Sequence, residues 1–244
     1  MHFALLCGYH LFMKAILLDI EGTTTPIDFV HKTLFPYAKK HIDRYVREHF
    51  AELEGEVAQL KEERAGDSAY EGNFDEGFPV SVAEYLTFLV DVDRKSTPLK
   101  SLQGKIWQEG YENGELKGEV FADVPGAFER WQSAGKKIAI YSSGSVLAQK
   151  LIFANSTGGD LTKYISDYFD TTTGAKRDSE GYKKIAETLK LAPADILFIS
   201  DIPAELDAAR AAGYTTALSL REGNAELTEE PNHRIIQTFD EITE

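Results

Sequence analysis

Short apolar runs mark the expected strands of this chain. Three of them are four or five residues long and apolar apart from one leading lysine: Ala15–Leu18, Lys137–Tyr141 and Ile196–Ile199. Strands that are covered on both faces show such continuous runs, whereas half-exposed strands alternate apolar with polar residues. The pattern therefore predicts three buried strands of a parallel sheet.

Segments with helical spacing of apolar residues separate these runs. Val146–Phe153 and Tyr182–Leu191 lie between the last two predicted strands. Beyond them, the helix-like Ala204–Ala212 ends at Gly213, a residue type common after helix C-termini, and the apolar run Thr215–Leu220 follows. Alternating strands and helices of this kind predict an α/β fold with a doubly wound parallel sheet.

Residues 27–117 follow a different pattern. Apolar residues recur there at helical spacing in three stretches, over residues 30–50, 82–89 and 99–107. Pro36 predicts a kink in the first stretch. Gly66–Pro79 is polar and rich in glycine and acidic residues, which predicts a loop. We expect a helical module inserted after the first strand.

The predicted division of the chain follows from these patterns. We expect an α/β core formed by residues 14–26 plus 118–244, and a helical cap formed by residues 27–117. Residues 1–13 are predicted to be an N-terminal extension. The alternative is that translation starts at Met13, directly before the first strand.

Composition and charge narrow the possible partners. The 244 residues include 26 Lys and Arg against 40 Asp and Glu, a net charge of −14 that repels nucleic-acid phosphates and anionic lipids. The single cysteine cannot form an internal disulfide, which suits a cytoplasmic protein. The apolar N-terminus is interrupted by His2, His10, Lys14 and Asp19, so we expect no membrane span. We expect no secretory signal either, because no basic segment precedes the apolar run and no small-residue cleavage site follows it.

Polar side chains follow the three predicted core strands, at Asp19, Ser142 and Asp201. Each alone could be an ordinary cap of a strand or of a following helix. In open parallel sheets, however, ligands bind beyond the carboxyl ends of the strands. Three reactive groups at three such ends therefore predict an active site at this edge.

The segment Asp19-Ile-Glu21-Gly22-Thr23-Thr24-Thr25 places several side chains that can react or bind a ligand in one tight turn. It offers two carboxylates, several hydroxyl groups and a glycine that allows close approach of a ligand to the backbone. The alternative is a helix N-terminus with acidic residues favoured by the helix dipole.

This segment resembles the first motif, Asp-x-Asp-x-Thr, of the haloacid dehalogenase-like phosphatases. At position 21 the chain has glutamate where this motif has its second aspartate. With that glutamate, the string from Asp19 to Pro26 is similar to the acireductone synthases, the enolase-phosphatases of methionine salvage. The resemblance implies a haloacid dehalogenase-like α/β core with a helical cap that closes over the substrate. It extends to five further strings: Leu34–Tyr37, Leu102–Gly104, Phe121–Val124, Tyr141–Ser145 and Ala148–Leu151.

The resemblance also assigns phosphate-binding residues. Ser142 and Ser143 match the second motif, which donates a hydrogen bond to a phosphoryl oxygen, and Lys176 matches the lysine of the third motif. Asp178 or Ser179 would cap the helix that follows this lysine. We expect Lys183 and Lys184 to be solvated instead.

The fourth motif matches Asp201 as a metal ligand and Glu205 as its accompanying acid, although Glu205 could equally compensate a helix dipole. Asp19, Glu21, Asp201 and Glu205 would face a substrate phosphate together. At a separation of roughly 4 Å and an effective dielectric constant near 20, each like-charge pair costs about 4 kcal/mol. A divalent cation relieves this repulsion, and Mg²⁺ is the usual partner of carboxylates and phosphate. We predict one Mg²⁺ per chain.

The resemblance implies a monomeric enzyme with a phosphorylated small-molecule substrate, 2,3-diketo-5-methylthiopentyl-1-phosphate, which is enolised and dephosphorylated to acireductone. Asp19 would attack phosphorus and form an aspartyl-phosphate, and Glu21 would transfer protons. The Mg²⁺ would bind Asp19, the Glu21 carbonyl and Asp201, with Thr23 and Glu205 in support. The enolisation base is open between Glu21 and a cap residue. The alternatives are a generic Mg²⁺-dependent phosphatase of the same superfamily and a binding protein without catalytic activity.

Overall fold

A six-stranded parallel sheet forms the centre of the α/β part of this protein, in a computed structural model that describes residues 13–227 and 231–243. The strand order is β3-β2-β1-β4-β5-β6. This order confirms the predicted doubly wound sheet. The strands are β1 (Ala15–Leu18), β2 (Lys137–Tyr141), β3 (Ile165–Phe169), β4 (Ile196–Ser200), β5 (Thr215–Ser219) and β6 (Arg234–Ile236).

The two edge strands, β3 and β6, have no counterpart among the predicted strands. β3 contains Ser166 and Asp167, and only its first and last residues are buried. β6 has three residues, of which only Ile236 is buried. An edge strand is covered less completely than a central one, so it lacks the continuous apolar run that marked β1, β2 and β4.

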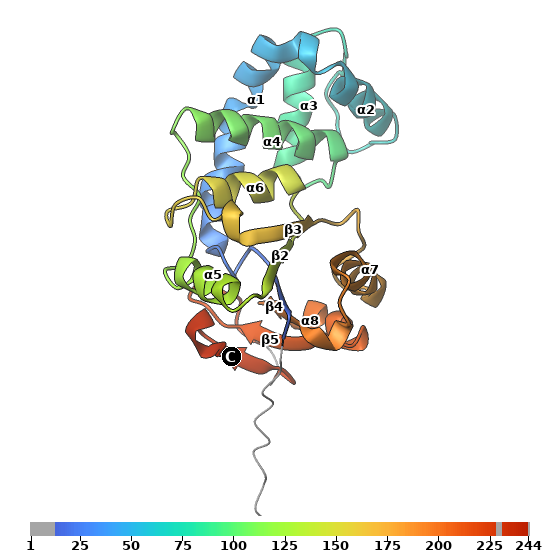
Figure 1. The fold of residues 1–244 in the computed structure, drawn as a ribbon. Helices are drawn as coiled ribbons and strands as arrows, with labels where there is room; N and C mark the ends of the chain where they lie inside the picture. The colour runs from blue at the N-terminus through green and yellow to red at the C-terminus, as the bar shows by residue number, and fades with distance from the viewer. Residues whose placement is uncertain (1–12, 228–230, 244) are drawn as a thin grey trace, which may run out of the picture. The chain divides into compact units, whose positions relative to one another are not determined.

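Helices cover both faces of the sheet, which buries every residue of β1 and β4. Figure 1 shows α7 (Ser179–Leu189) and α8 (Pro203–Ala211) on one face and α5 (Val124–Ser133) on the other. Side chains of β1, β2 and β4 pack with those of α7 and α8 in one buried cluster that includes Leu17, Tyr141, Tyr182, Phe198 and Leu206.

Capping residues set the bounds of the helices that follow β3 and β4. The Asp178 side chain accepts a hydrogen bond from the Glu180 N–H, so Asp178 rather than Ser179 caps α7. After α8, Gly213 adopts a φ of +95°, a backbone conformation that suits glycine, and turns the chain into β5. The predicted end of this helix at Gly213 is confirmed.

The helical part contains α1 (Phe35–His49), α2 (Glu54–Ala65), α3 (Pro79–Asp91), α4 (Thr97–Glu112) and α6 (Val146–Ala154). The kink at Pro36 stays a prediction: Pro36 is the second residue of α1, and Leu34, directly before α1, also has right-handed helical φ and ψ angles. A π-helical turn, Phe29–Leu34, precedes α1. No helix in the described residues is both long and apolar enough to cross a membrane.

Contacts divide the chain into two compact units. Among the described residues, the α/β unit contains 13–24, Phe121–Ser143, 163–227 and 231–243, and the helical unit contains Thr25–Val120 and Gly144–Thr162. The predicted boundaries placed residues 144–162 in the core. In the structure α6 packs against α4, where Gly104 lies beside the Leu147 side chain, so these residues group with the helices. Of the predicted extension, residues 1–12 lie outside the described residues.

Candidate active site

The sheet register brings the predicted strand ends to one edge. Leu18 of β1 pairs with Ile140 of β2 and with Ile199 of β4. The Asp19 N–H continues this pairing by donating to the Ile199 carbonyl oxygen at 3.0 Å. Asp19, Ser142 and Asp201 therefore leave neighbouring strands at the same edge of the sheet.

A buried lysine joins two of the predicted carboxylates. The Lys176 Nζ lies 2.7 Å from Asp19 Oδ1 and 2.6 Å from Glu205 Oε2. The Lys176 side chain is only 8 % exposed, so this ion pair is shielded from water and from salt. The structure thus brings Lys176, Asp19 and Glu205 together.

Two tyrosines fix the loop that carries this lysine. The Tyr182 hydroxyl donates to the Lys176 carbonyl oxygen at 2.7 Å, and the Tyr141 hydroxyl donates to the Gly174 carbonyl oxygen at 2.8 Å. The Lys176 ammonium also lies 5.8 Å from the centre of the Tyr141 ring, within range of a cation–π interaction. The direction of the Lys176 side chain is therefore set by residues of β2 and α7.

Ser200, the last residue of β4, links the same two carboxylates. Its hydroxyl oxygen lies 3.2 Å from Asp19 Oδ2 and 3.0 Å from Glu205 Oε2, so its one proton can be donated to either. The hydroxyl also accepts a hydrogen bond from the Ile202 N–H at 3.1 Å. Sequence reasoning missed this role, although Ser200 stands next to Asp201 at a predicted strand end.

Burial and charge shift the pKa values of the ionisable groups here. Burial raises the pKa of Asp201 to about 7, and the charges of Asp19 and Glu205 add to this effect. Burial, followed by the charge of Asp19, raises the pKa of Glu205 to about 6. Burial alone would lower the pKa of Lys176, but the charges of Asp19 and Glu205 outweigh it and raise that pKa. The carboxyl groups thus oppose one another's ionisation, while Lys176 is kept protonated between two of them.

The turn after β1 is tightly held. The Ile20 N–H donates to Asp19 Oδ1 at 2.7 Å, and the N–H groups of Thr23 and Thr24 both donate to the Ile20 carbonyl oxygen. Gly22 has a φ of +66°. This geometry confirms the turn expected from the sequence between Asp19 and Thr24.

The other predicted residues differ in exposure. Ser142 is buried, and its N–H donates to the Phe169 carbonyl oxygen, whereas Ser143 is exposed. Glu21 is half-buried. Thr23 is fully buried, and its hydroxyl has no hydrogen-bond partner among the described residues.

Sequence and structure comparisons identify the family. The haloacid dehalogenase-like hydrolase model matches residues 13–213. An enolase-phosphatase E1 of Synechococcus elongatus is 51 % identical over 94 % of this chain and 98 % of its own length. One from Leptospira borgpetersenii is 54 % identical over 86 % of this chain and 90 % of its own. The chain belongs to the haloacid dehalogenase-like hydrolases, among the enolase-phosphatase E1 proteins.

A solved structure supports the same assignment of fold. The protein UTR4 of Saccharomyces cerevisiae superposes with a TM-score of 0.78 at 33 % identity, over 93 % of this chain and 99 % of that one. The relatives named above confirm the resemblance to enolase-phosphatases expected from the sequence, and this chain is a hydrolase with phosphatase chemistry. Haloacid dehalogenase-like phosphatases are generally metal-dependent.

The donor set of this hydrolase fits a hard divalent cation. No group of three or more His, Cys, Asp or Glu side chains is arranged to hold a metal in the described parts of the chain. Asp19 and Asp201, the carboxylate ligands expected from the sequence, would have to be complemented by main-chain, water or substrate oxygens. That arrangement is typical of Mg²⁺, which keeps several waters and binds through one or two carboxylates.

Gly22 offers a test of this turn. A Cβ at Gly22 would lie 2.5 Å from Asp201 Oδ2, so Gly22→Ala has to displace the Asp201 carboxylate. We expect a loss of kcat of about 100-fold from this misplacement. The left-handed backbone adds about 1–2 kcal/mol of destabilisation.

Gly135→Ala is the matched control, because Gly135 has a φ of +75° but no atom within 4 Å of an added Cβ. It should show the loss of stability in denaturant without the loss of kcat. Equal kcat in both variants would contradict the close approach of Asp201 to Gly22.

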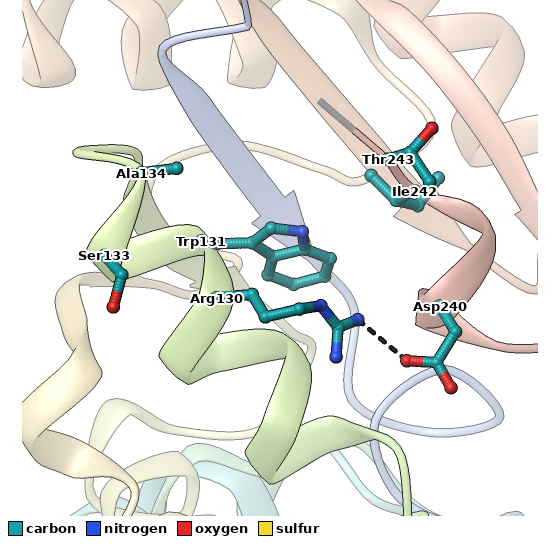
Figure 2. Close-up of a pocket in the computed structure, with 7 residues that line it drawn as sticks. All are labelled: Arg130, Trp131, Ser133, Ala134, Asp240, Ile242 and Thr243. Atoms are coloured by element: carbon teal, nitrogen blue, oxygen red, sulfur yellow. Dashed lines mark ion pairs between the residues drawn. The ribbon is translucent and has the colours of Figure 1, made fainter.

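A pocket of about 450 Å³ lies elsewhere in the α/β unit, between α5 and the C-terminal segment. Figure 2 shows Arg130 pairing with Asp240 at its side, at 2.8 Å, and the Trp131 ring beside them. None of the residues predicted for catalysis lines this pocket, so we assign it no part in the reaction.

Proposed function

We propose that this enzyme converts 2,3-diketo-5-methylthiopentyl-1-phosphate to acireductone and phosphate. The observation that carries the phosphatase half is the Lys176 ammonium between Asp19 and Glu205, at the edge where Asp201 and Ser142 also emerge. The enolase half rests on the similarity to enolase-phosphatase E1 proteins at about 50 % identity over most of the chain.

The proposed role of Asp19 is nucleophilic. Its carboxylate attacks phosphorus, the bond between phosphorus and the substrate oxygen breaks, and Glu21 donates a proton to the leaving oxygen. Glu21 then takes a proton from water, which attacks the phosphorus of the aspartyl-phosphate, releases phosphate and restores the Asp19 carboxylate. Both Asp19 oxygens already have partners, which orients the carboxylate for this step.

Lys176 and Ser142 are proposed to hold the phosphoryl oxygens, by charge and by a hydrogen bond. Ser143 and Thr23 are proposed to support this binding, and Glu205 to hold Lys176 in place. When bound, Mg²⁺ would neutralise charge on the transferring phosphoryl group. The Asp19 and Asp201 carboxylates and the Glu21 carbonyl oxygen would hold it.

A second candidate function is that of a generic Mg²⁺-dependent phosphatase. It would use the same Asp19, Lys176 and Asp201 without an enolase step. The high identity to proteins named enolase-phosphatase favours the first candidate. We further propose that the protein is a cytoplasmic monomer. Size-exclusion chromatography would test the monomeric state, and cell fractionation would test the location.

Removal of the metal tests the proposed reaction. We expect phosphate release and the absorbance of the enediol product to appear together, under anaerobic conditions, from the synthetic diketo-phosphate with Mg²⁺. Excess EDTA should abolish both, because the surplus carboxylate charge would then face the substrate phosphate directly. Restoring Mg²⁺ should recover both signals.

Two results would contradict the proposal in different ways. Release from simple phosphate esters, but not from the diketo-phosphate, would retain the phosphatase and reject the substrate. Undiminished release in EDTA would reject the metal.

A further inference from the structure

The loop after β5 holds the carbonyl group of Gly22. The Ser219 hydroxyl donates to the Gly22 carbonyl oxygen at 3.2 Å, and the Asn224 Nδ2 donates to the same oxygen at 3.0 Å. The Asn224 Nδ2 also donates to the Ser219 carbonyl oxygen at 3.0 Å. Both hydrogens of the Asn224 amide are therefore used, one of them on the turn that follows Glu21.

The Asn224 side chain also lies on the side of this turn where Asp201, a proposed metal ligand, lies. A Cβ at Gly22 would lie 2.8 Å from Asn224 Oδ1 and 2.5 Å from Asp201 Oδ2, so both oxygens lie close beside the Gly22 α-carbon. Asn224 Oδ1 is buried and has no hydrogen-bond partner among the described residues. A buried acceptor oxygen without a hydrogen bond costs free energy of folding, unless a group that binds at the site donates to it.

The hydrogen bonds within this turn end on Asp19 and on the Ile20 carbonyl oxygen, whereas Ser219 and Asn224 bond the Gly22 carbonyl oxygen from outside the turn. Glycine adopts many backbone conformations, so Gly22 by itself does not fix the direction of the peptide groups on either side of it. The two hydrogen bonds to its carbonyl oxygen select one orientation. The Glu21 carbonyl group directly precedes this peptide group in the chain, so the two bonds add a restraint beside it.

The loop that provides these bonds is itself anchored. Arg221 forms a bidentate ion pair with Asp123: its Nη1 lies 3.0 Å from Oδ1 and its Nη2 lies 2.8 Å from Oδ2. The Arg221 Nη1 also donates to the Gln237 carbonyl oxygen. The Asn224 N–H donates to the Arg221 carbonyl oxygen at 3.2 Å. Asn224 thus stands one short turn beyond a buried, rigid ion pair.

We propose that Asn224, assisted by Ser219, is a positioning residue that locks the Glu21–Gly22 turn in its catalytic conformation. The inference rests on the proposed function for the role of Glu21. The locking itself rests only on the hydrogen bonds of the Gly22 carbonyl group.

The test compares Asn224→Asp with Asn224→Ala. Asp has the shape of Asn but lacks both N–H donors, so it removes the bonds and retains the packing while adding a charge. Asn224→Ala removes the same bonds without adding a charge, so an effect shared by both variants is due to the lost bonds. Glu222→Ala is the matched control, since Glu222 is exposed on the same loop. We expect kcat to fall 10- to 100-fold in both Asn224 variants, the usual range for partners that orient metal-site ligands, with KM changed less than threefold.

Two further readouts separate positioning from general stability. The Mg²⁺ concentration needed for half of the metal-induced rise in Tm should increase at least fivefold in the Asn224 variants. Hydrogen exchange in the peptide that covers residues 19–24 should accelerate about tenfold without metal or substrate, because the N–H groups of Thr23 and Thr24 bond within this turn. Glu222→Ala should change neither quantity.

The outcomes distinguish this inference from the proposed function. Asn224 variants with kcat, Mg²⁺ requirement and exchange within twofold of the wild type would overturn it. If the wild-type enzyme releases no phosphate from any ester, the proposed function fails. The hydrogen-exchange rate of residues 19–24 then decides by itself whether Asn224 holds the turn. If Asn224→Ala does not fold, Asn224→Asp and Ser219→Ala, which removes the other donor to Gly22, replace it.

Discussion

Asp19→Asn should reduce phosphate release by about 10⁴-fold or more, the range seen when a covalent nucleophile is removed. The amide nitrogen cannot attack phosphorus, and the remaining amide oxygen is a far weaker nucleophile than a carboxylate. The measurement is single-turnover phosphate release with Mg²⁺. Trapping of a phosphorylated chain by acid quench should succeed for the wild type and fail for the variant.

The fold of this variant should be intact, because Asn fills the same space and its oxygen can still accept from the Ile20 N–H. Asp207→Asn is the matched control, since Asp207 is an exposed carboxylate on α8. It should release phosphate at the wild-type rate. An Asp19→Asn variant with substantial turnover would reject Asp19 as the nucleophile.

Lys176→Met should lose both activity and stability. Met has a similar volume but no charge, so the buried carboxylates of Asp19 and Glu205 would lose their shared cation. Removing one partner of a buried ion pair usually costs about 3–5 kcal/mol, because the other charge stays buried without a partner. We expect a loss of this size in denaturant unfolding at pH 7 without metal. Phosphate release should fall by about 100- to 1000-fold, the range for losing one strong charge-stabilising group.

A second substitution separates the two effects. Glu205→Gln, added to Lys176→Met, removes one of the uncompensated charges and should recover part of the stability but none of the activity. Lys183→Met is the control, because Lys183 pairs with Glu180 at the surface and should contribute at most about 1 kcal/mol. A Lys176→Met variant as stable as the Lys183 variant would contradict the buried ion pair.

Central strands were predictable because both of their faces are covered. Every residue of β1 and β4 is buried, and such strands show as uninterrupted apolar runs. β3 and β6 lie at the edges of the sheet, where polar residues or short length remove that signal. The helix α2 was also missed, because it buries only Val57 and Leu60.

The same logic explains which site residues could be predicted. Strand ends meet at one edge of a parallel sheet, so position alone indicated Asp19, Ser142 and Asp201. Applied to the predicted run Thr215–Leu220, this rule would also have indicated the residues that follow it, among which is Asn224. It was not enough for Lys176, whose assignment came from its resemblance to a family motif.

The sequence by itself determined the parallel α/β fold, the family and the edge of the sheet where carboxylates gather, because these depend on local pattern and motif. Only the tertiary structure decided which partners these groups meet. Lys176 reaches Asp19 because Tyr141 and Tyr182 hold its loop, and Asn224 reaches Gly22 across 202 positions of the chain. Such contacts are set by how distant loops pack, and no local pattern of residues encodes that packing.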